Sequence, residues 1–212
     1  MSRSGLDAFA GRILRALVEN DTLFHVLRLP AYWGTLPHLV RAVDAGAGER
    51  LLDIGCGTGL GMSLTRGTYV GIDTELRYLR MARRRAPGPR CSFLWMSAVD
   101  LGFRDGVFDK AVLINMVHHL EEADVDRLLL QLSRVVRGRV VVLDAAPDIA
   151  NRVGRFILAH DRGRYVRRLA DLRALLARRY VIEREEVFYN ATRTVRQVLF
   201  TLAPLGSSRA CE

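Results

Sequence analysis

The chain has 212 residues, half of them hydrophobic, and carries a formal net charge of +9 at neutral pH. This size and composition predict one folded domain with a sizeable core, and no apolar stretch approaches the ~18 residues of a membrane span. The net charge is compatible with nucleic-acid binding. However, Lys110 is the only lysine among the 32 basic residues, so we attribute the excess to a compositional bias toward arginine and expect no nucleic-acid partner.

The cysteines and the start of the chain bear on location. Cys56, Cys91 and Cys211 show neither disulfide nor metal-ligand spacing, which favours a reducing compartment. Residues 1–21 are charged throughout and lack the apolar segment of a signal peptide. We therefore expect a cytoplasmic protein without a bound metal.

The first part of the chain predicts helices. Apolar residues recur at roughly helical spacing over 6–29, as on one face of an amphipathic helix, and Pro30 ends this element. Tyr32 and Trp33 belong to a second short element, and a glycine-containing loop over 46–48 follows it.

The most informative run is LLDIGCGTG, at residues 51–59. Its apolar start suits a buried parallel strand. It ends in glycines at alternate positions, Gly55, Gly57 and Gly59. Glycine lets the backbone turn sharply and approach a bound molecule with no Cβ atom in the way. This run therefore predicts a ligand-binding turn at the carboxyl end of a strand.

A second apolar strand, 69–72, ends at Asp73, where an acid can accept hydrogen bonds from both hydroxyls of a ribose. The turn has no third glycine in the frame of a dinucleotide fingerprint, and no lysine follows it as in a P-loop. Asp53, just before the glycines, would repel a pyrophosphate and suits a ligand that carries an amine or a sulfonium. The sequence thus predicts a nucleoside site for such a ligand.

From residue 49 onward, strand and helix patterns alternate, which predicts a mainly parallel sheet covered on both faces. The predicted strands are 50–54, 68–72, 92–96, 108–114 and 139–144, and the predicted helices are 59–65, 75–86, 121–136 and 166–179. Residues 180–204 predict two further strands joined near 190–194.

Residues 49–147 resemble the class I S-adenosylmethionine-dependent methyltransferases, and within them the small-molecule branch typified by ubiquinone and menaquinone C-methyltransferases. The matching runs are LLDIGCGTG, VGIDTELRYLRMAR, SAVDLGFRDGVFDKAVLINMVHHL and LSRVVRGRVVVLDAAP, in the family's order and spacing. The resemblance implies a Rossmann-like, doubly wound α/β fold with a mainly parallel seven-stranded sheet whose last strand is antiparallel. We expect an N-terminal helical lid over 1–48, a cofactor-binding core over 49–204 and a flexible tail over 205–212, within a single domain.

The resemblance also implies S-adenosylmethionine as cofactor and S-adenosylhomocysteine as product. Asp53 and the glycine turn would hold the amino-acid end, Asp73 the ribose, and residues 94–101 would flank the adenine. The expected cofactor-binding residues are Asp53, Gly55, Cys56, Gly57, Gly59, Asp73, Thr74, Ser97, Ala98 and Asn115. Ser97 departs from the Asp that the family often has there, and an uncharged hydroxyl should make a weaker contact with the adenine amine.

Methyl transfer from a sulfonium needs few catalytic side chains, because the leaving thioether is neutral and alignment can supply much of the rate. A base is needed only where the acceptor begins protonated. His118 and His119 follow the fourth strand, and either could be a base near neutral pH or could brace the loop. Asp144 ends the fifth strand and could orient a substrate hydroxyl, act as a base or cap the next helix.

Four aromatic or imidazole side chains are expected in the substrate pocket: Tyr32, Trp33, His160 and Tyr165. Tyr32 and Trp33 could equally pack against the core. The segment 152–168 is rich in arginine, which suits an anionic acceptor or peripheral contact with an anionic membrane, and equally a solvated basic face.

We expect methyl transfer to an oxygen, carbon or nitrogen atom of a small-molecule biosynthetic intermediate in a bacterial pathway. Two alternatives stay open. The first keeps the cofactor but catalyses cyclisation or isomerisation without net transfer. The second is a non-catalytic nucleoside-binding subunit whose basic face meets RNA.

Overall fold

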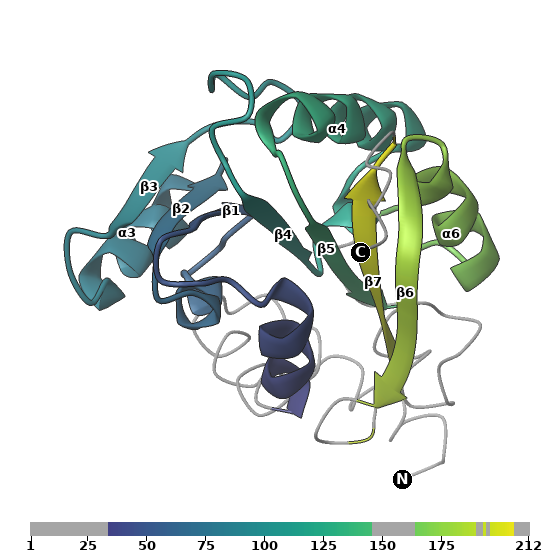
Figure 1. Ribbon diagram of the computed structural model, residues 1–212, viewed down its shortest axis with the longest axis horizontal. Helices are drawn as coiled ribbons and strands as arrows, with labels where there is room; N and C mark the ends of the chain where they lie inside the picture. Colours follow the sequence, from purple (N-terminus) through teal and green to yellow (C-terminus); the bar gives the residue numbers. More distant parts are fainter. Residues whose placement is uncertain (1–33, 146–163, 190–192, 194–195, 206–212) are drawn as a thin grey trace, which may run out of the picture.

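The structure is a computed structural model that describes residues 34–145, 164–189, 193 and 196–205. Within these residues, seven strands form one sheet in the spatial order β3-β2-β1-β4-β5-β7-β6 (Figure 1). The strands are β1 (Arg50–Ile54), β2 (Thr68–Asp73), β3 (Cys91–Trp95), β4 (Lys110–Ile114), β5 (Val140–Ala145), β6 (Tyr180–Tyr189) and β7 (Arg196–Pro204). Strands β1 to β5 pair in parallel, and β7 is antiparallel to both β5 and β6. The predicted fold is therefore confirmed.

The strand register brings the ends of the inner strands together. Ile54 pairs with Ile72 of β2 and with Leu113 of β4, and Ile114 pairs with Leu143 of β5. Because these strands are parallel, the loops that follow them leave the sheet at one edge, where ligands bind in open α/β sheets.

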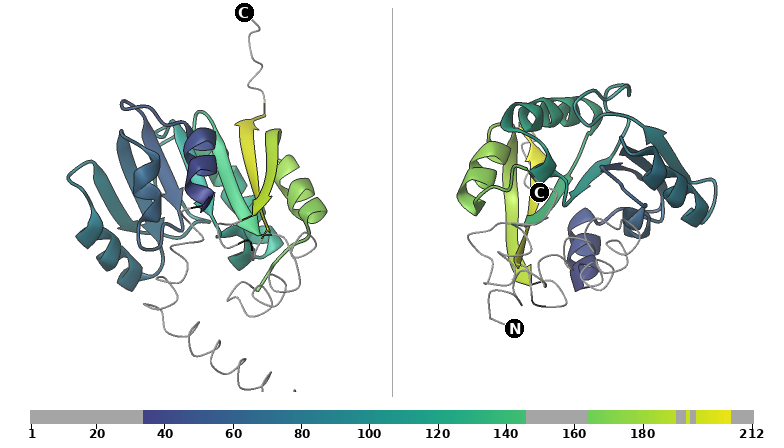
Figure 2. Two further views of the ribbon diagram at one scale, coloured as in Figure 1. Left: turned by 90° about the horizontal axis from the view of Figure 1, so that it is seen from below. Right: turned by 180° about the vertical axis from the view of Figure 1, so that it is seen from behind.

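Alternate residues of each strand enter cores on opposite faces of the sheet, as the two-residue period requires. Leu52 and Ile54 pack with α4 (Glu122–Val135) and α6 (Leu169–Ala177). Leu51 packs on the other face with α3 (Leu76–Arg85) and with the helical residues 34–43. Seen from behind, α4 and α6 lie next to each other (Figure 2). Burial on both faces explains why the strands are apolar runs.

The predicted helix over 59–65 is a short 3-10 helix, η1 (Leu60–Leu64). Gly59 precedes it in the left-handed region and Thr65 ends it in an extended conformation. The short connection between β1 and β2 leaves room for little more than one turn. A second 3-10 turn, η2 (Val117–His119), follows β4.

Two other elements are shorter than predicted. The helix expected over 166–179 begins at Leu169, because residue 168 is extended and Arg167 donates to the carbonyl groups of Val117 and Leu120. The strand expected over 108–114 begins at Lys110, because Phe108 forms a separate bridge.

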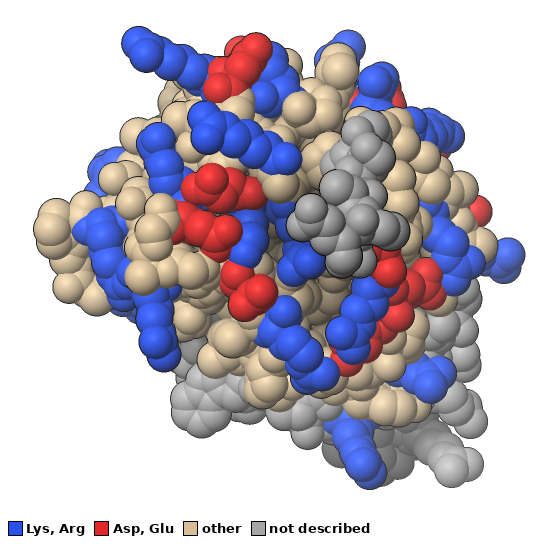
Figure 3. All heavy atoms as spheres, viewed as in Figure 1, with Lys and Arg blue, Asp and Glu red and all other residues tan. Residues whose placement is uncertain are grey.

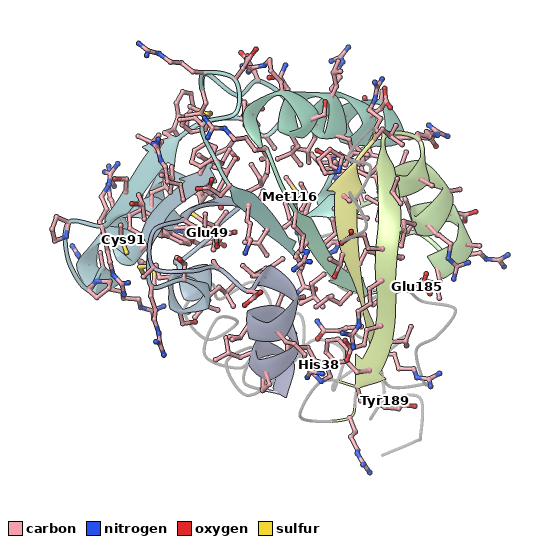
Figure 4. All side chains as sticks on the ribbon, in the orientation of Figure 1. His38, Glu49, Cys91, Met116, Glu185 and Tyr189 are labelled. Carbon is pink, nitrogen blue, oxygen red and sulfur yellow. The ribbon has the colours of Figure 1, made fainter. Side chains whose placement is uncertain are left out.

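Residues 34–48 are the described part of the predicted lid, and 34–43 of them are helical. Leu39 and Val43 are fully buried against the sheet. His38 lies 2.6 Å from Glu186 of β6 and stacks on Phe188, and Figure 4 shows His38 between this helix and β6. The earlier part of the lid and residues 206–212 lie outside the described residues, so the division of the chain into lid, core and tail stays a prediction.

Candidate functional site

The glycine turn after β1 is held by its neighbours on the sheet. Gly55, Gly57 and Gly59 have φ angles of 68°, 53° and 80°, which side chains with a Cβ atom rarely adopt. The amide of Cys56 donates to the carbonyl of Ile72 over 2.9 Å, so β2 fixes where the turn begins. The turn is therefore a rigid continuation of β1.

The three glycines differ in what surrounds them. A Cβ atom at Gly55 would lie 2.7 Å from Met116, which Figure 4 labels in the loop after β4. A Cβ atom at Gly59 would lie 2.8 Å from Met62. At Gly57 no atom of the described chain lies within 4 Å of that position. Gly55 and Gly59 thus serve internal packing, whereas the space beside Gly57 is open among the described residues, as the predicted ligand turn requires.

Asp73 closes the turn from β2. Its Oδ2 accepts from the amide of Gly57 and its Oδ1 from the amide of Glu75, both over 2.8 Å. A carboxylate has about four acceptor sites, so these bonds leave Asp73 able to accept the hydroxyls of a ribose. The open backbone at Gly57 beside a half-buried carboxylate fits a nucleoside cofactor.

Asp53 lies beneath the turn and is 2% exposed. The Tyr69 hydroxyl donates to its Oδ2 over 2.5 Å. Burial raises the pKa of Asp53 to about 7, and the nearby charge of Asp73 adds to that rise, while the hydrogen bond from Tyr69 opposes it. Asp53 therefore faces the interior, and its role at the amino-acid end of a cofactor stays a prediction.

Cys56 also points inward. Its side chain is 7% exposed and packs where a Cβ atom at Gly71 would lie 2.8 Å from its Sγ. Burial raises the pKa of its thiol far above the ordinary value, so the thiol is neutral at physiological pH. Any contact between Cys56 and a cofactor would come through its main chain.

The predicted adenine-flanking residues lie after β2 and β3. Ser97 and Thr74 are exposed and Ala98 is partly buried, and the Ser97 hydroxyl accepts from the amide of Val99 over 3.4 Å. Trp95 pairs with Asp73 in the register, is 64% exposed, and donates from Nε1 to the carbonyl of Thr74. A large exposed aromatic beside Asp73 is a further candidate for contact with the adenine, and Trp95 lies within the range 94–101 that the resemblance places beside the adenine.

His118 and Asp144 form a buried pair at the same sheet edge. They are 4% and 2% exposed. Nδ1 of His118 lies 2.5 Å from Oδ1 of Asp144, and the His118 amide donates to Oδ2 over 3.1 Å. His119 is exposed and its ring lies against that of His118, with centroids 4.3 Å apart. The structure thus distinguishes the two histidines: His118 is the one that Asp144 holds.

Asn115 connects this edge to the N-terminal helix. It has a φ of 50°, a left-handed conformation that asparagine tolerates, and its amide donates to the carbonyl of Leu143. Its side-chain oxygen accepts from Gln197 of β7 over 3.4 Å, and Gln197 in turn accepts from the Thr35 hydroxyl over 2.7 Å. Gln197 and Thr35 are residues for which the sequence pattern gave no functional signal.

Tyr165 and Arg167 form a wall beside the pair. The amide of Tyr165 donates to the carbonyl of His118, and Arg167 donates to the carbonyl groups of Val117, Leu120 and Tyr165. A hollow is lined by Val117, His118, Asp144, Ala145, Tyr165, Arg167 and Leu172. Tyr165 is therefore placed beside the His118–Asp144 pair, and its role in a substrate pocket stays a prediction.

The other predicted pocket residues, Tyr32, Trp33 and His160, lie outside the described residues, as does most of the arginine-rich segment 152–168. On the face shown in Figure 3, basic side chains are interspersed with acidic ones. None of the helices among the described residues is long and apolar enough to cross a bilayer. In the same part of the chain, no three His, Cys, Asp or Glu side chains are grouped as metal ligands would be.

A parallel sheet in this strand order, with an antiparallel β7 and a glycine turn opposite an acidic strand end, is the architecture of the class I S-adenosylmethionine-dependent methyltransferases. Residues 52–143, which run from β1 into β5, match the family described as "Methyltransferase domain". The core of the chain is therefore similar to this methyltransferase family over residues 52–143.

Relatives agree with this assignment. A demethylmenaquinone methyltransferase of Thermobifida fusca is 34% identical over 134 residues, which cover 58% of this chain and 55% of that protein. An O-methyltransferase of Penicillium expansum is 33% identical over 111 residues, which cover 48% of this chain and 40% of that protein. The chain therefore spans about half the length of the curated relatives it matches, or less.

A solved structure shares the fold. The crystal structure of a geranyl diphosphate C-methyltransferase from Streptomyces coelicolor A3(2), in complex with S-adenosyl-L-homocysteine among other ligands, superposes with a TM-score of 0.66 at 15% identity. The match covers 80% of this chain and 74% of that one. At this identity the likeness supports the fold alone.

Proposed function

We propose that this protein transfers the methyl group of S-adenosylmethionine to an oxygen or carbon atom of a small organic acceptor, with His118 as the base. The observation that carries the proposal is the buried His118–Asp144 pair, at the sheet edge that also bears Gly57 and Asp73. The names of the two relatives, an O-methyltransferase and a quinone-pathway enzyme, support an acceptor of this kind.

Different residues bind the cofactor and accept the proton. When bound, S-adenosylmethionine supplies an electrophilic methyl group and a neutral thioether leaving group. Gly57 and Asp73 hold the nucleoside, and the main chain around Asn115 shapes the methionine end of the site. This fixed placement supplies alignment, which can account for much of the rate of a displacement.

The His118–Asp144 pair removes the proton of the acceptor. Asp144 is an acceptor for Nδ1–H of His118, which leaves the lone pair of a neutral ring on Nε2. As the acceptor atom bonds the methyl carbon, its proton passes to Nε2, and the carboxylate of Asp144 stabilises the imidazolium that forms. Nε2 of His118 is buried in the structure, and the adjoining hollow beside Tyr165 and Arg167 has no room for a water-sized molecule, so the proposal requires these side chains to move when an acceptor binds.

A cytoplasmic location is part of the proposal. Cys56 and Cys91 are free thiols in the structure, as expected for a reducing compartment.

Recognition of the acceptor by its charge is also part of the proposal: Arg164 and Arg168, which flank Tyr165 and Arg167 in the chain, are exposed and suit an acceptor that carries a carboxylate or phosphate.

The test has two parts. Calorimetry with S-adenosylhomocysteine should show binding to the purified protein, and its absence would refute the assignment. The protein is then incubated with S-adenosylmethionine and a panel of quinols, phenols and fatty acids, followed by mass spectrometry. A gain of one CH₂ in an acceptor supports transfer. A rearranged acceptor of unchanged mass would favour the cyclase alternative, and salt-dependent RNA binding without any acceptor would favour the RNA-associated one.

A further inference from the structure

Tyr69 and Asp53 form a buried pair directly beneath the glycine turn. Tyr69 is fully buried, Asp53 is 2% exposed, and the hydroxyl lies 2.5 Å from Oδ2 of the carboxyl group. Tyr69 pairs with Leu51 in the register, whereas Asp53 pairs with Gly71. The Tyr69 ring therefore extends along the sheet, past Gly71, to reach the carboxyl group of Asp53, which lies two residues further along the register.

Two glycines make this contact possible. A Cβ atom at Gly71 would lie 3.1 Å from Cε1 of Tyr69 and 2.8 Å from Sγ of Cys56. A Cβ atom at Gly61 of η1 would lie 2.2 Å from Oδ2 of Asp53 and 3.5 Å from the Tyr69 hydroxyl oxygen. Backbone without side chains thus closes over the pair from two sides, and the pair has little freedom to rearrange.

The charge state of Asp53 depends on the groups that face it. Burial and the carboxylate of Asp73 both disfavour its ionised form. Cys56, from the turn, is a neutral thiol, because burial raises its pKa, and Gly61 brings no charge from η1. The Tyr69 hydroxyl is the contact that favours the carboxylate, since a hydrogen bond donated to a charged acceptor is stronger than one to its neutral form.

We propose that Tyr69 is a positioning residue that favours the ionised form of Asp53, and that this buried charge makes the site favour cationic S-adenosylmethionine over S-adenosylhomocysteine. The two ligands differ by the sulfonium charge, which is lost with the methyl group. A negative charge under the turn attracts the donor more than the product, and low-dielectric surroundings strengthen that difference. The inference rests on the proposed function only for the identity of the cofactor.

The pH dependence of binding tests the idea without an acceptor. The affinities of S-adenosylmethionine and S-adenosylhomocysteine are measured by calorimetry between about pH 6 and pH 9. In the wild type their ratio should rise through about pH 7, where Asp53 ionises. In Tyr69→Phe the midpoint of this rise should move up by about one pH unit, and the ratio at neutral pH should fall about three- to fivefold. The ligands' own groups titrate equally in every variant, so the difference isolates the protein.

Tyr180→Phe is the matched control. Tyr180 is also buried, and its hydroxyl has no hydrogen-bond partner among the described residues. Loss of that hydroxyl should leave both the ratio and its midpoint unchanged. An equal shift in Tyr180→Phe and Tyr69→Phe would overturn the proposal, as would an unshifted midpoint in Tyr69→Phe.

Asp53→Asn decides the question even where Tyr69→Phe does not fold. This variant removes the charge but keeps an oxygen that can accept from Tyr69, so its affinity ratio should be low and flat over the whole pH range. A wild-type pH profile in Asp53→Asn would refute a role for this charge while leaving the methyltransferase assignment intact. A wild type that binds neither ligand would overturn both.

Discussion

His118 Nδ1 lies 2.5 Å from Oδ1 of Asp144, although the two residues are 26 positions apart in the chain. Parallel pairing of β4 with β5 brings their ends to the same edge. The carboxylate also accepts from the His118 amide, so both the ring and the backbone of His118 are fixed by one side chain. Such a pair orients an imidazole and selects its tautomer.

Asp144→Asn should impair methyl transfer without weakening cofactor binding. The amide cannot stabilise an imidazolium, so we expect kcat/KM for an identified acceptor to fall about 100-fold, with the affinity for S-adenosylhomocysteine changed less than about twofold. His119→Gln is the comparison, because His119 is exposed and its ring packs against the His118 ring. Near-wild-type activity in Asp144→Asn, together with an inactive His119→Gln, would assign the base to His119.

Asp73→Ala should weaken cofactor binding. The change removes the acceptor for the Gly57 and Glu75 amides as well as the predicted contact with the ribose. We expect the affinity for S-adenosylhomocysteine to fall about 10- to 100-fold in calorimetry. Asp105→Asn is a suitable control, since Asp105 is exposed and pairs with Arg134 instead. Equal affinities for the two variants would contradict the placement of the nucleoside at Asp73.

Gly61→Ala should destabilise the fold. The added Cβ atom would lie 2.2 Å from Oδ2 of Asp53, and the buried carboxyl group is fixed by Tyr69. Forced repacking of this kind costs about 1–3 kcal/mol in the free energy of unfolding, measured with denaturant. Gly48→Ala adds a Cβ atom with nothing within 4 Å and should be close to neutral, so similar losses in both variants would argue against the close packing at Gly61.

The stability contribution of Asp53 should fall as the pH rises. Its pKa is raised from 3.8 to about 7 in the folded state, mainly by burial. Between these values the folded protein retains a proton that the unfolded chain releases, so the native state loses stability relative to the unfolded state. The contribution is constant below the unfolded pKa and above the folded one.

Asp53→Asn does not titrate, so the comparison is direct. Relative to this variant, the wild type should lose up to about 4 kcal/mol between about pH 4 and pH 7 in urea unfolding. Asp105→Asn, at an exposed site, should follow the wild-type curve. Parallel curves for wild type and Asp53→Asn would show that Asp53 is ionised in the folded state well below neutral pH.

Thr35→Val should loosen the contact between the N-terminal helix and the sheet. The Thr35 hydroxyl donates to Gln197, which donates to Asn115, and loss of a buried hydrogen bond of this kind costs about 1–2 kcal/mol of stability. Thr201→Val is a matched control, because the buried Thr201 hydroxyl has no hydrogen-bond partner among the described residues. It should be neutral or stabilising, so a larger loss there than in Thr35→Val would contradict this account.

The sequence alone determined the sheet and the edge that bears the glycine turn and Asp73. Apolar strands at regular spacing must bury both faces, and the glycine turn and Asp73 each follow or end a parallel strand, so the sequence predicted that Gly57 and Asp73 lie at the same edge. Both depend on local backbone features, a strand that stops and a glycine that turns, which a short stretch of sequence specifies. The resemblance to methyltransferases draws on the same motifs.

Tertiary structure decided which side chains meet. The run NMVHHL does not show which histidine has a partner, and it is the pairing of β4 with β5 that brings Asp144 into contact with His118. Tyr69 reaches Asp53 only because Gly71 and Gly61 leave room for it, and Thr35 meets Gln197 across 162 residues. Such contacts depend on strand register, on rotamers and on the space left by third residues, which are set when the whole core packs and not by any one segment.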